Sequence, residues 1–313
     1  FRSINRLNQN LKLSAGISYN WTFRNISLQP EYNYAYSYIK TDNPLYRLDK
    51  ISGRDSSLFD RLPSATSILA TVLDNGNTYH FTEYQNSHQF NFCYRDLHSK
   101  LLKCEISVNL PVRIAHANLY YQRMGRHDVS RQSIFFEPNI WLRGNAWEIK
   151  AKMNSELPDL TTMVNYRDDS NPMNIILGNM QLRNIHYYDI EGGKTFEGKK
   201  HSRLNINMGY HQADNAVAYS LVFDKQTGVS TVQPISVNGN YRIDLGIGYT
   251  RPLDKKEKLS IDNQASFNYN HNVDMAMVQG TTQSQRSIVN NWKISNVLKL
   301  NYRPDDNYEF TLH

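Results

Sequence analysis

The sequence predicts an all-β fold, an antiparallel transmembrane β-barrel, and three patterns carry this prediction. Apolar and polar residues alternate along most of the 313 residues. Many alternating segments reach the ~9–11 residues that a tilted strand needs to cross a bilayer, whereas strands of soluble proteins average about 5–6. Short and long connections between the segments also alternate. Together these patterns favour a membrane barrel over a soluble sandwich.

The first two segments show the alternation plainly. In residues 10–21 the odd positions are apolar and the even positions small or polar, and residues 25–38 place a run of tyrosines on one face: Tyr32, Tyr34, Tyr36 and Tyr38. An α-helix cannot separate two such sets, because alternate residues lie about 200° apart around its axis. Both segments are therefore expected to be strands with one apolar and one polar face.

The same period of two recurs along the rest of the chain, most clearly at 147–153, 204–211, 241–249 and 292–302. Counting every such segment, we expect about fourteen strands, with edges placed to within about two to four residues. The polar faces are rich in Asn, Ser, Gln, Lys and Arg. In a wide membrane barrel such faces line the interior, while the apolar faces meet lipid.

The connections fall into two sets by strand parity. One set is short and rich in turn residues: 22–24, 97–100, 143–145, 224–228, 251–257 and 303–307, with a longer member near 191–200. The other holds every long insertion, 41–85, 122–131, 155–182 and 272–285, and two tight turns near 213–215 and 238–240. Short periplasmic turns and long extracellular loops are typical of bacterial outer-membrane barrels. We therefore expect residues 1–313 to form part of one such domain, with long extracellular loops near 41–85 and 155–182.

The composition limits the possible partners. No run of about 18 apolar residues encodes a transmembrane helix. The net charge is +6, but the Lys and Arg residues are scattered, which argues against nucleic acid and favours contact with outer-membrane lipid and lipopolysaccharide. The 21 tyrosines suit a membrane interface, where one end of the side chain is dry and the other wet. A Tyr-rich soluble β-rich binding protein is the alternative that composition leaves open.

We find no arrangement of residues that predicts catalysis, a cofactor or a metal site, and we expect the protein not to be an enzyme. The motifs G-x-S-x-G, H-E-x-x-H, C-x-x-C and the P-loop are absent from the sequence. The ten His residues show no ligand spacing. Residues 168–171 and 305–307 are acidic, but they lack the spacing of a calcium loop and are interpreted as turns.

One segment resembles a known family. It contains Leu157-Pro158-Asp159-Leu160, then Asn171-Pro172, then Gly178-Asn179-Met180-Gln181-Leu182. Residues 157–184 are similar to the mid-barrel loop of the TonB-dependent-receptor-like outer-membrane β-barrel family, which has Gly-Asn-Pro-x-Leu-x-Pro-Glu where the next strand begins. Gly178, Asn179 and Leu182 match this motif. Met180 and Asn184 replace its two prolines, and its glutamate is absent.

The resemblance implies a complete barrel of about 22 strands that encloses a plug domain. It also implies uptake of a bound nutrient, driven by an inner-membrane energy-coupling protein that pulls on the plug. The plug domain and the closing strands are expected to lie outside this chain. The alternative is a non-transporting outer-membrane barrel, either an adhesin or the partner of a surface lipoprotein.

The ligand, a small molecule, glycan or peptide, is expected to bind on the extracellular loops and the upper interior. The two longest loops hold the best candidates, because long loops commonly carry function. Stacking and hydrogen-bonding groups there are Tyr79, Tyr84, Tyr166, Arg167 and Asp168. The alternative is that these residues only pack the loops together.

Overall fold

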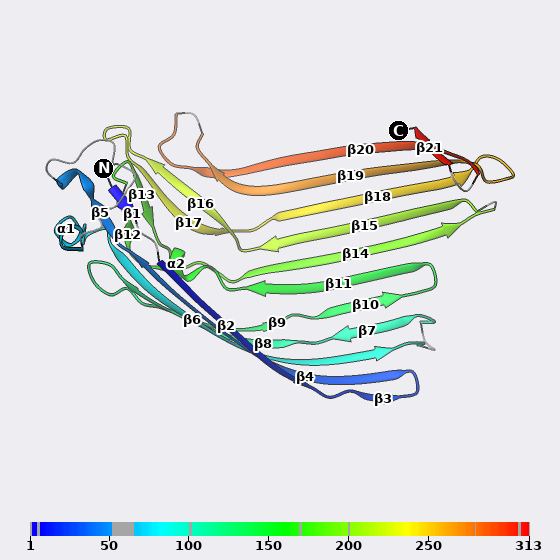
Figure 1. Cartoon of the computed structure of the whole chain (residues 1–313), viewed down its shortest axis with the longest axis horizontal. Coiled ribbons are helices and arrows are strands. Elements are labelled where there is room, and N and C mark those ends of the chain that lie inside the picture. Colours follow the sequence, from blue (N-terminus) through cyan, green and yellow to red (C-terminus); the bar gives the residue numbers. More distant parts are fainter. Residues whose placement is uncertain are drawn as a thin grey trace.

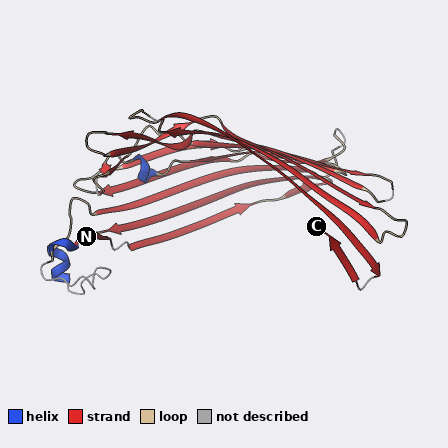
Figure 2. Cartoon of the chain, turned by 90° about the horizontal axis from the view of Figure 1, so that it is seen from above, coloured by secondary structure: helices blue, strands red, loops and turns tan. Residues whose placement is uncertain are grey.

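The chain forms a large, curved antiparallel sheet (Figures 1 and 2), and 71% of the residues that the structure describes are in strands. The computed structural model describes residues 2–4, 7–51, 66–99, 102–168, 171–199, 201–278, 280–305 and 308–312. Fifteen strands belong to the large sheet, and two smaller sheets have four strands and two strands. The all-β antiparallel fold expected from the alternation is confirmed. Of the acidic turns noted above, Asp169, Ser170, Asp306 and Asn307 lie outside the described residues.

Twelve strands follow one another across the large sheet, each paired with the next. In order they are β2 (Leu7–Ser18), β4 (Ile26–Asn43), β6 (Tyr79–Asp96), β7 (Glu105–Asn109), β10 (Asn139–Arg143), β11 (Trp147–Glu156), β14 (Ile185–Glu197), β15 (Arg203–Asp214), β18 (Asn240–Pro252), β19 (Leu259–Ala276), β20 (Gln285–Asp305) and β21 (Tyr308–Leu312). The other three, β3 (Trp21–Phe23), β8 (Val112–Gln122) and β9 (Val129–Phe136), continue β2, β7 and β10 across short interruptions.

The large sheet has twelve successive strands, two fewer than the fourteen expected, because β16 (Ala216–Phe223) and β17 (Ser230–Val237) do not belong to it. They form a hairpin beside β12 (Arg167–Asp168) and β13 (Asn174–Leu177), while β15 pairs directly with β18. The prediction that 224–228 is a short turn at the far end was wrong, since this segment is the tip of the hairpin. An inserted hairpin adds two strands, so it leaves the parity of every later strand unchanged.

The connections separate to the two ends of the sheet, as parity predicts (Figure 1). We call the end with the long insertions the loop end and the other the turn end. The loop end carries β5 (Leu45–Arg47), the 3-10 helix η1 (Leu48–Lys50), α1 (Thr66–Thr71), α2 (Leu160–Met163) and the β16–β17 hairpin, and β1 (Arg2–Ile4) pairs with β5 there. Among the described residues, no helix is long and apolar enough to cross a bilayer.

The two faces of the sheet differ in polarity. The outer face exposes large apolar side chains, for example Ile17 (72% exposed), Ile134 (69%) and Trp292 (69%). Register shows that the cross-strand neighbours on this face are also apolar, as in the pairs Ile190–Tyr210 and Phe267–Ile294. The inner face carries Asn, Asp, Ser, Lys and Arg. A soluble sandwich would bury its apolar stripes, whereas these stripes are open, as a surface facing hydrocarbon requires.

The buried core of the chain lies at the loop end, against the inner face. There the 157–184 segment folds back onto β6, β8 and β9, and Leu160, Met163 and Leu182 are at most 2% exposed. They pack on inward side chains of the wall, including Leu119 and Val129. This packing positions the loop across the upper interior of the sheet.

A seam interrupts the ladder of the wall between β9 and β11. Within the described residues β9 pairs with β8 alone. Side chains form the hydrogen bonds to β11 that the backbone of β9 does not form. Glu137 accepts a hydrogen bond from Ser155 N (2.8 Å), and Arg113 donates to Ser155 O (2.6 Å). Arg113 and Glu137 also form an ion pair at 2.6 Å. Pro138, which has no backbone N–H, follows at the point where β9 gives way to β10.

Candidate functional site

A cavity of about 510 Å³ lies at the loop end, and we call it the mouth pocket. Three parts of the chain enclose it: the inner face of β4, β6 and β8, the 157–184 loop, and the β16–β17 hairpin. The wall contributes Tyr79, Glu83 and Tyr121, and the hairpin contributes Tyr219. The volume falls within the range of small-molecule sites.

The family-like motif holds the loop over this pocket. Asn179 ties three segments together: its N–H donates to Thr162 O (2.9 Å), its amide donates to Pro234 O (2.8 Å), and its side-chain oxygen accepts from Gln181 N (2.9 Å). Leu182 is 1% exposed and anchors the end of the loop in the core. Gly178 therefore lines the pocket, and Asn179 and Leu182 hold the loop that forms the roof of the pocket.

Gly178 brings the loop backbone into contact with itself, because a Cβ at this position would overlap the backbone oxygen of Val164. Gly178→Ala is therefore expected to push the roof away from α2 and to lower the free energy of unfolding by about 1–3 kcal/mol. Urea unfolding of the purified protein in detergent measures the change. Gly76→Ala is the control, because its Cβ meets only ordinary contacts at 3.5 Å. A loss no larger than that of Gly76→Ala would contradict the close approach.

Arg123, in the β8–β9 connection, joins three loop-end segments. Its side chain is fully buried and donates to Gly76 O (3.1 Å) and to Asn77 Oδ1 (2.5 Å). Its Nη1 lies 2.9 Å from Asp168 Oδ1, and its guanidinium lies over the ring of Tyr166 at 4.6 Å. Burial acts to lower the pKa of Arg123, but hydrogen bonds and the charge of Asp168 outweigh it and raise that pKa. Arg123 is thus a buried cation that holds the loop-end segments together, and we call it the latch.

The structure divides the five candidate ligand residues. Tyr79, Tyr166 and Asp168 line the mouth pocket together, whereas Arg167 is exposed on β12 and does not line it. Tyr79 and Tyr84 were expected in a loop, but both belong to strand β6. Tyr84 lies on the outer face, where its ring contacts two tyrosines of neighbouring strands, Tyr38 and Tyr120.

That placement corrects the role expected of Tyr84. A row of tyrosines on the apolar face near the loop end is typical of the aromatic belt at a membrane interface. The pocket residues that sequence analysis missed are Glu83, Tyr121 and Tyr219, together with Arg123 behind the pocket wall. One signal in the sequence predicts part of this set. Strand β6 begins at Tyr79, and its alternation places Tyr79, Phe81 and Glu83 on the face opposite His80, Thr82 and Tyr84.

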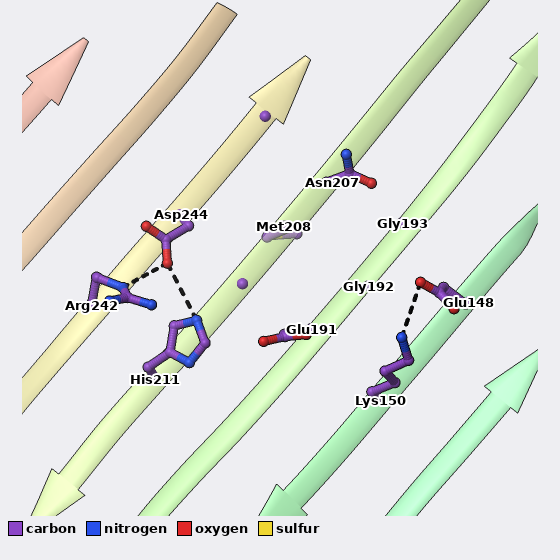
Figure 3. Close-up of a pocket in the computed structure, with 12 residues that line it drawn as sticks. Glu148, Lys150, Glu191, Gly192, Gly193, Asn207, Met208, His211, Arg242 and Asp244 are labelled. Atoms are coloured by element: carbon purple, nitrogen blue, oxygen red, sulfur yellow. Dashed lines mark hydrogen bonds and ion pairs between the residues drawn. The ribbon is translucent and has the colours of Figure 1, made fainter. Parts of the chain in front are cut away.

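Farther along the wall, the inner face carries a polar groove of about 400 Å³ across β11, β14, β15 and β18 (Figure 3). His211 lies between two carboxylates, with Nδ1 against Asp189 and Nε2 3.3 Å from Asp244. Arg242 also reaches Asp244, at 2.7 Å. Gly209 opens the groove, since a Cβ there would come within 3.2 Å of His211 Nε2.

The groove offers hydrogen-bonding and charged groups. Two of its three carboxylates, Glu148 and Asp244, are paired with Lys150 and Arg242. In the described part of the chain, no group of three or more His, Cys, Asp or Glu residues is arranged to hold a metal ion. The absence of a metal site and of an enzymatic role remain predictions.

Comparison with known proteins shows the fold. No protein-family model and no curated protein matches the sequence. The hemophore receptor HasR of Serratia marcescens, solved with its hemophore HasA and heme, is similar with a TM-score of 0.55 at 10% identity, over 97% of this chain and 50% of that one. The copper transporter OprC is similar with a TM-score of 0.50 at 9% identity, over 98% and 51%.

The chain thus spans about half the length of these two proteins. At such low identity the likeness establishes the architecture alone. It confirms that nearly the whole chain has the fold of part of an outer-membrane β-barrel, as in these two proteins.

Proposed function

We propose that this chain forms part of the wall of a bacterial outer-membrane receptor of the TonB-dependent type, which binds a nutrient at its loop end and takes it up. One observation carries the proposal: a wide sheet with an apolar outer face and a polar inner face ends in a loop-built pocket that opens onto that inner face. Closed barrels leave no unpaired backbone in lipid, which is why such a sheet suits a membrane.

The arrangement supports a route for the ligand. The mouth pocket lies at the loop end, and the groove around His211 lies on the same inner face farther toward the turn end. A solute released from the pocket would meet polar groups rather than hydrocarbon. The names of the structural neighbours, a hemophore receptor and a copper transporter, support a small ligand. The proposal includes a plug domain and an inner-membrane energy-coupling protein as partners, and no enzymatic step.

The proposal predicts that cells lacking the protein fail to take up at least one nutrient. We expect the full-length protein to require detergent and to migrate faster on an unheated gel than on a heated one, as folded barrels do. We expect radiolabelled uptake across a panel of nutrients to fall at least about tenfold for one compound in the deletion strain, because the outer membrane otherwise excludes it. Uptake in the parent strain should stop when an uncoupler removes the proton gradient.

Two results would contradict this function. Full-length protein that stays monodisperse without detergent would favour a soluble binding protein. Unchanged uptake of every compound, with normal detergent and gel behaviour, would favour the non-transporting barrel, either an adhesin or the partner of a surface lipoprotein. Complementation with the unaltered gene is the control for the deletion.

A further inference from the structure

We propose that the mouth pocket selects a ligand that carries an organic cation, an amine or a guanidinium, attached to an apolar body. The inference rests on the proposed receptor function and names the chemical class of its ligand. Three features carry it: uncompensated carboxylates in the lining, a continuous set of tyrosine rings, and an exposed apolar wall opposite them.

The charge of the pocket is opposite to that of the chain. Glu83, Asp159 and Asp168 line the pocket, and among the described residues that line it none is Lys, Arg or His. The chain as a whole has a net charge of +6. Arg123 matches Asp168 from behind, at 2.9 Å. The pocket is therefore left with two carboxylates that have no matching charge.

Of these two carboxylates, Glu83 is the stronger evidence for a cationic ligand. Its residue is only 8% exposed, and its carboxylate accepts a hydrogen bond from the neutral amide of Gln85 (2.5 Å). Asp159 likewise accepts from neutral groups, the backbone N–H and the hydroxyl of Thr161, both at 2.8 Å. Within the described residues, neither carboxylate forms an ion pair with a basic side chain. A buried carboxylate without a counter-charge is unfavourable, and a cationic ligand would supply that charge.

The aromatic lining adds attraction for the same kind of group. The rings of Tyr79 and Tyr121 stack at 5.6 Å, and Tyr166 adjoins Tyr121 at 6.2 Å. Cations bind over the faces of such rings. Arg123 already lies over Tyr166 in this way, with 4.6 Å between its guanidinium carbon and the ring centroid. Tyr79, Tyr121 and Tyr166 all line the pocket, so a cation of the ligand would lie close to their rings.

The opposite wall suits an apolar body. Ile176 on β13 and Tyr219 on β16 are 47% and 53% exposed, and both line the pocket. Covering these side chains would be favourable by about 25 cal/mol per Å² of apolar surface. A ligand that places its cation near Glu83 and its apolar part against Ile176 uses both walls. An anion of the same shape would face two carboxylates.

The test compares two probes that have one apolar body and opposite charges. Tryptamine is the cation and indole-3-acetate the anion, and calorimetry measures their binding to the purified full-length protein in detergent. We expect tryptamine to bind at least about tenfold more tightly than indole-3-acetate, because only the amine can donate a charge-assisted hydrogen bond to Glu83. Glu83→Gln, which keeps the shape of the side chain, should weaken tryptamine binding about tenfold. Asp159→Asn, which keeps the helix cap, should weaken it in the same direction.

Glu197→Gln is the matched control, because this carboxylate is exposed near the turn end of β14 and should leave tryptamine binding unchanged. Heat-dependent gel migration confirms that each variant is folded. Equal or tighter binding of indole-3-acetate, tryptamine binding that survives both pocket substitutions, or no binding of either probe would overturn the inference. Uptake in cells is measured separately, so failure of the cation preference is distinguishable from failure of the receptor function.

Discussion

Glu137→Ala is expected to lower the free energy of unfolding by about 3–5 kcal/mol, the range for breaking a buried ion pair. Glu137 and Arg113 are 12% and 21% exposed, and they satisfy the backbone N–H and C=O of Ser155 at the seam between β9 and β11. Loss of the carboxylate leaves Ser155 N without its acceptor and Arg113 without its counter-charge. An unsatisfied backbone group in a membrane wall is especially unfavourable. The midpoint of urea unfolding in detergent, followed by heat-dependent gel migration, measures the loss.

Glu309→Ala is the matched control for the seam. Glu309 also pairs with an arginine, Arg303, at 2.7 Å, but these two side chains are 49% and 61% exposed. Exposed pairs contribute about 0–1 kcal/mol. If Glu137→Ala lowers the free energy of unfolding no more than Glu309→Ala does, the side chains of Arg113 and Glu137 do not stabilise the seam. The wall would then have another source of stability there.

Arg123→Met is expected to release the 157–184 loop from the mouth of the barrel. The substitution keeps an apolar stem of similar length but removes the charge that holds Asp168 and the donors that hold Gly76 and Asn77. We expect a loss of about 3–5 kcal/mol in the stability of the loop-end cluster, because Asp168 loses the positive charge that Arg123 places 2.9 Å away. Limited proteolysis should then cut within 157–184 at least about tenfold faster, since cleavage follows the population of the open form.

Arg126→Met is the control for the latch. Arg126 lies in the same β8–β9 connection and pairs with Asp128, but its side chain is 68% exposed. The control should leave the cleavage rate of the 157–184 loop unchanged. Equal cleavage of Arg123→Met and the unaltered protein would show that the apolar core around Leu160 and Leu182 holds the loop without Arg123.

The alternation of side chains predicted both faces of the wall, because a strand points successive residues to opposite sides whatever it pairs with. Ile17 and Trp292, read from the sequence as members of apolar stripes, are exposed on the outer face. Strand parity likewise predicted which end carries the long insertions. The β16–β17 hairpin was not predicted, because two additional strands return the chain to the same parity and leave the order of the later connections unchanged.

Part of the candidate site followed from loop length and residue type. Tyr79, Tyr166 and Asp168 do gather at one pocket, and their role in ligand binding stays a prediction. Tyr84 was misplaced because it is an even-numbered residue of β6, on the face opposite Tyr79. Nothing in the sequence of the 122–131 connection distinguishes Arg123, since its burial depends on Gly76, Asn77 and Asp168 meeting around it.

By itself the sequence determined the strand type, the polarity of each face and the end that holds the loops, because all three depend on spacing along the chain. The tertiary structure alone decided which strands pair, where the wall is closed by side chains at Arg113 and Glu137, and which residues meet in the mouth pocket. Those features depend on contacts between residues far apart in sequence. A period of two specifies the side of a strand on which a residue lies, but not the neighbour that lies beside it.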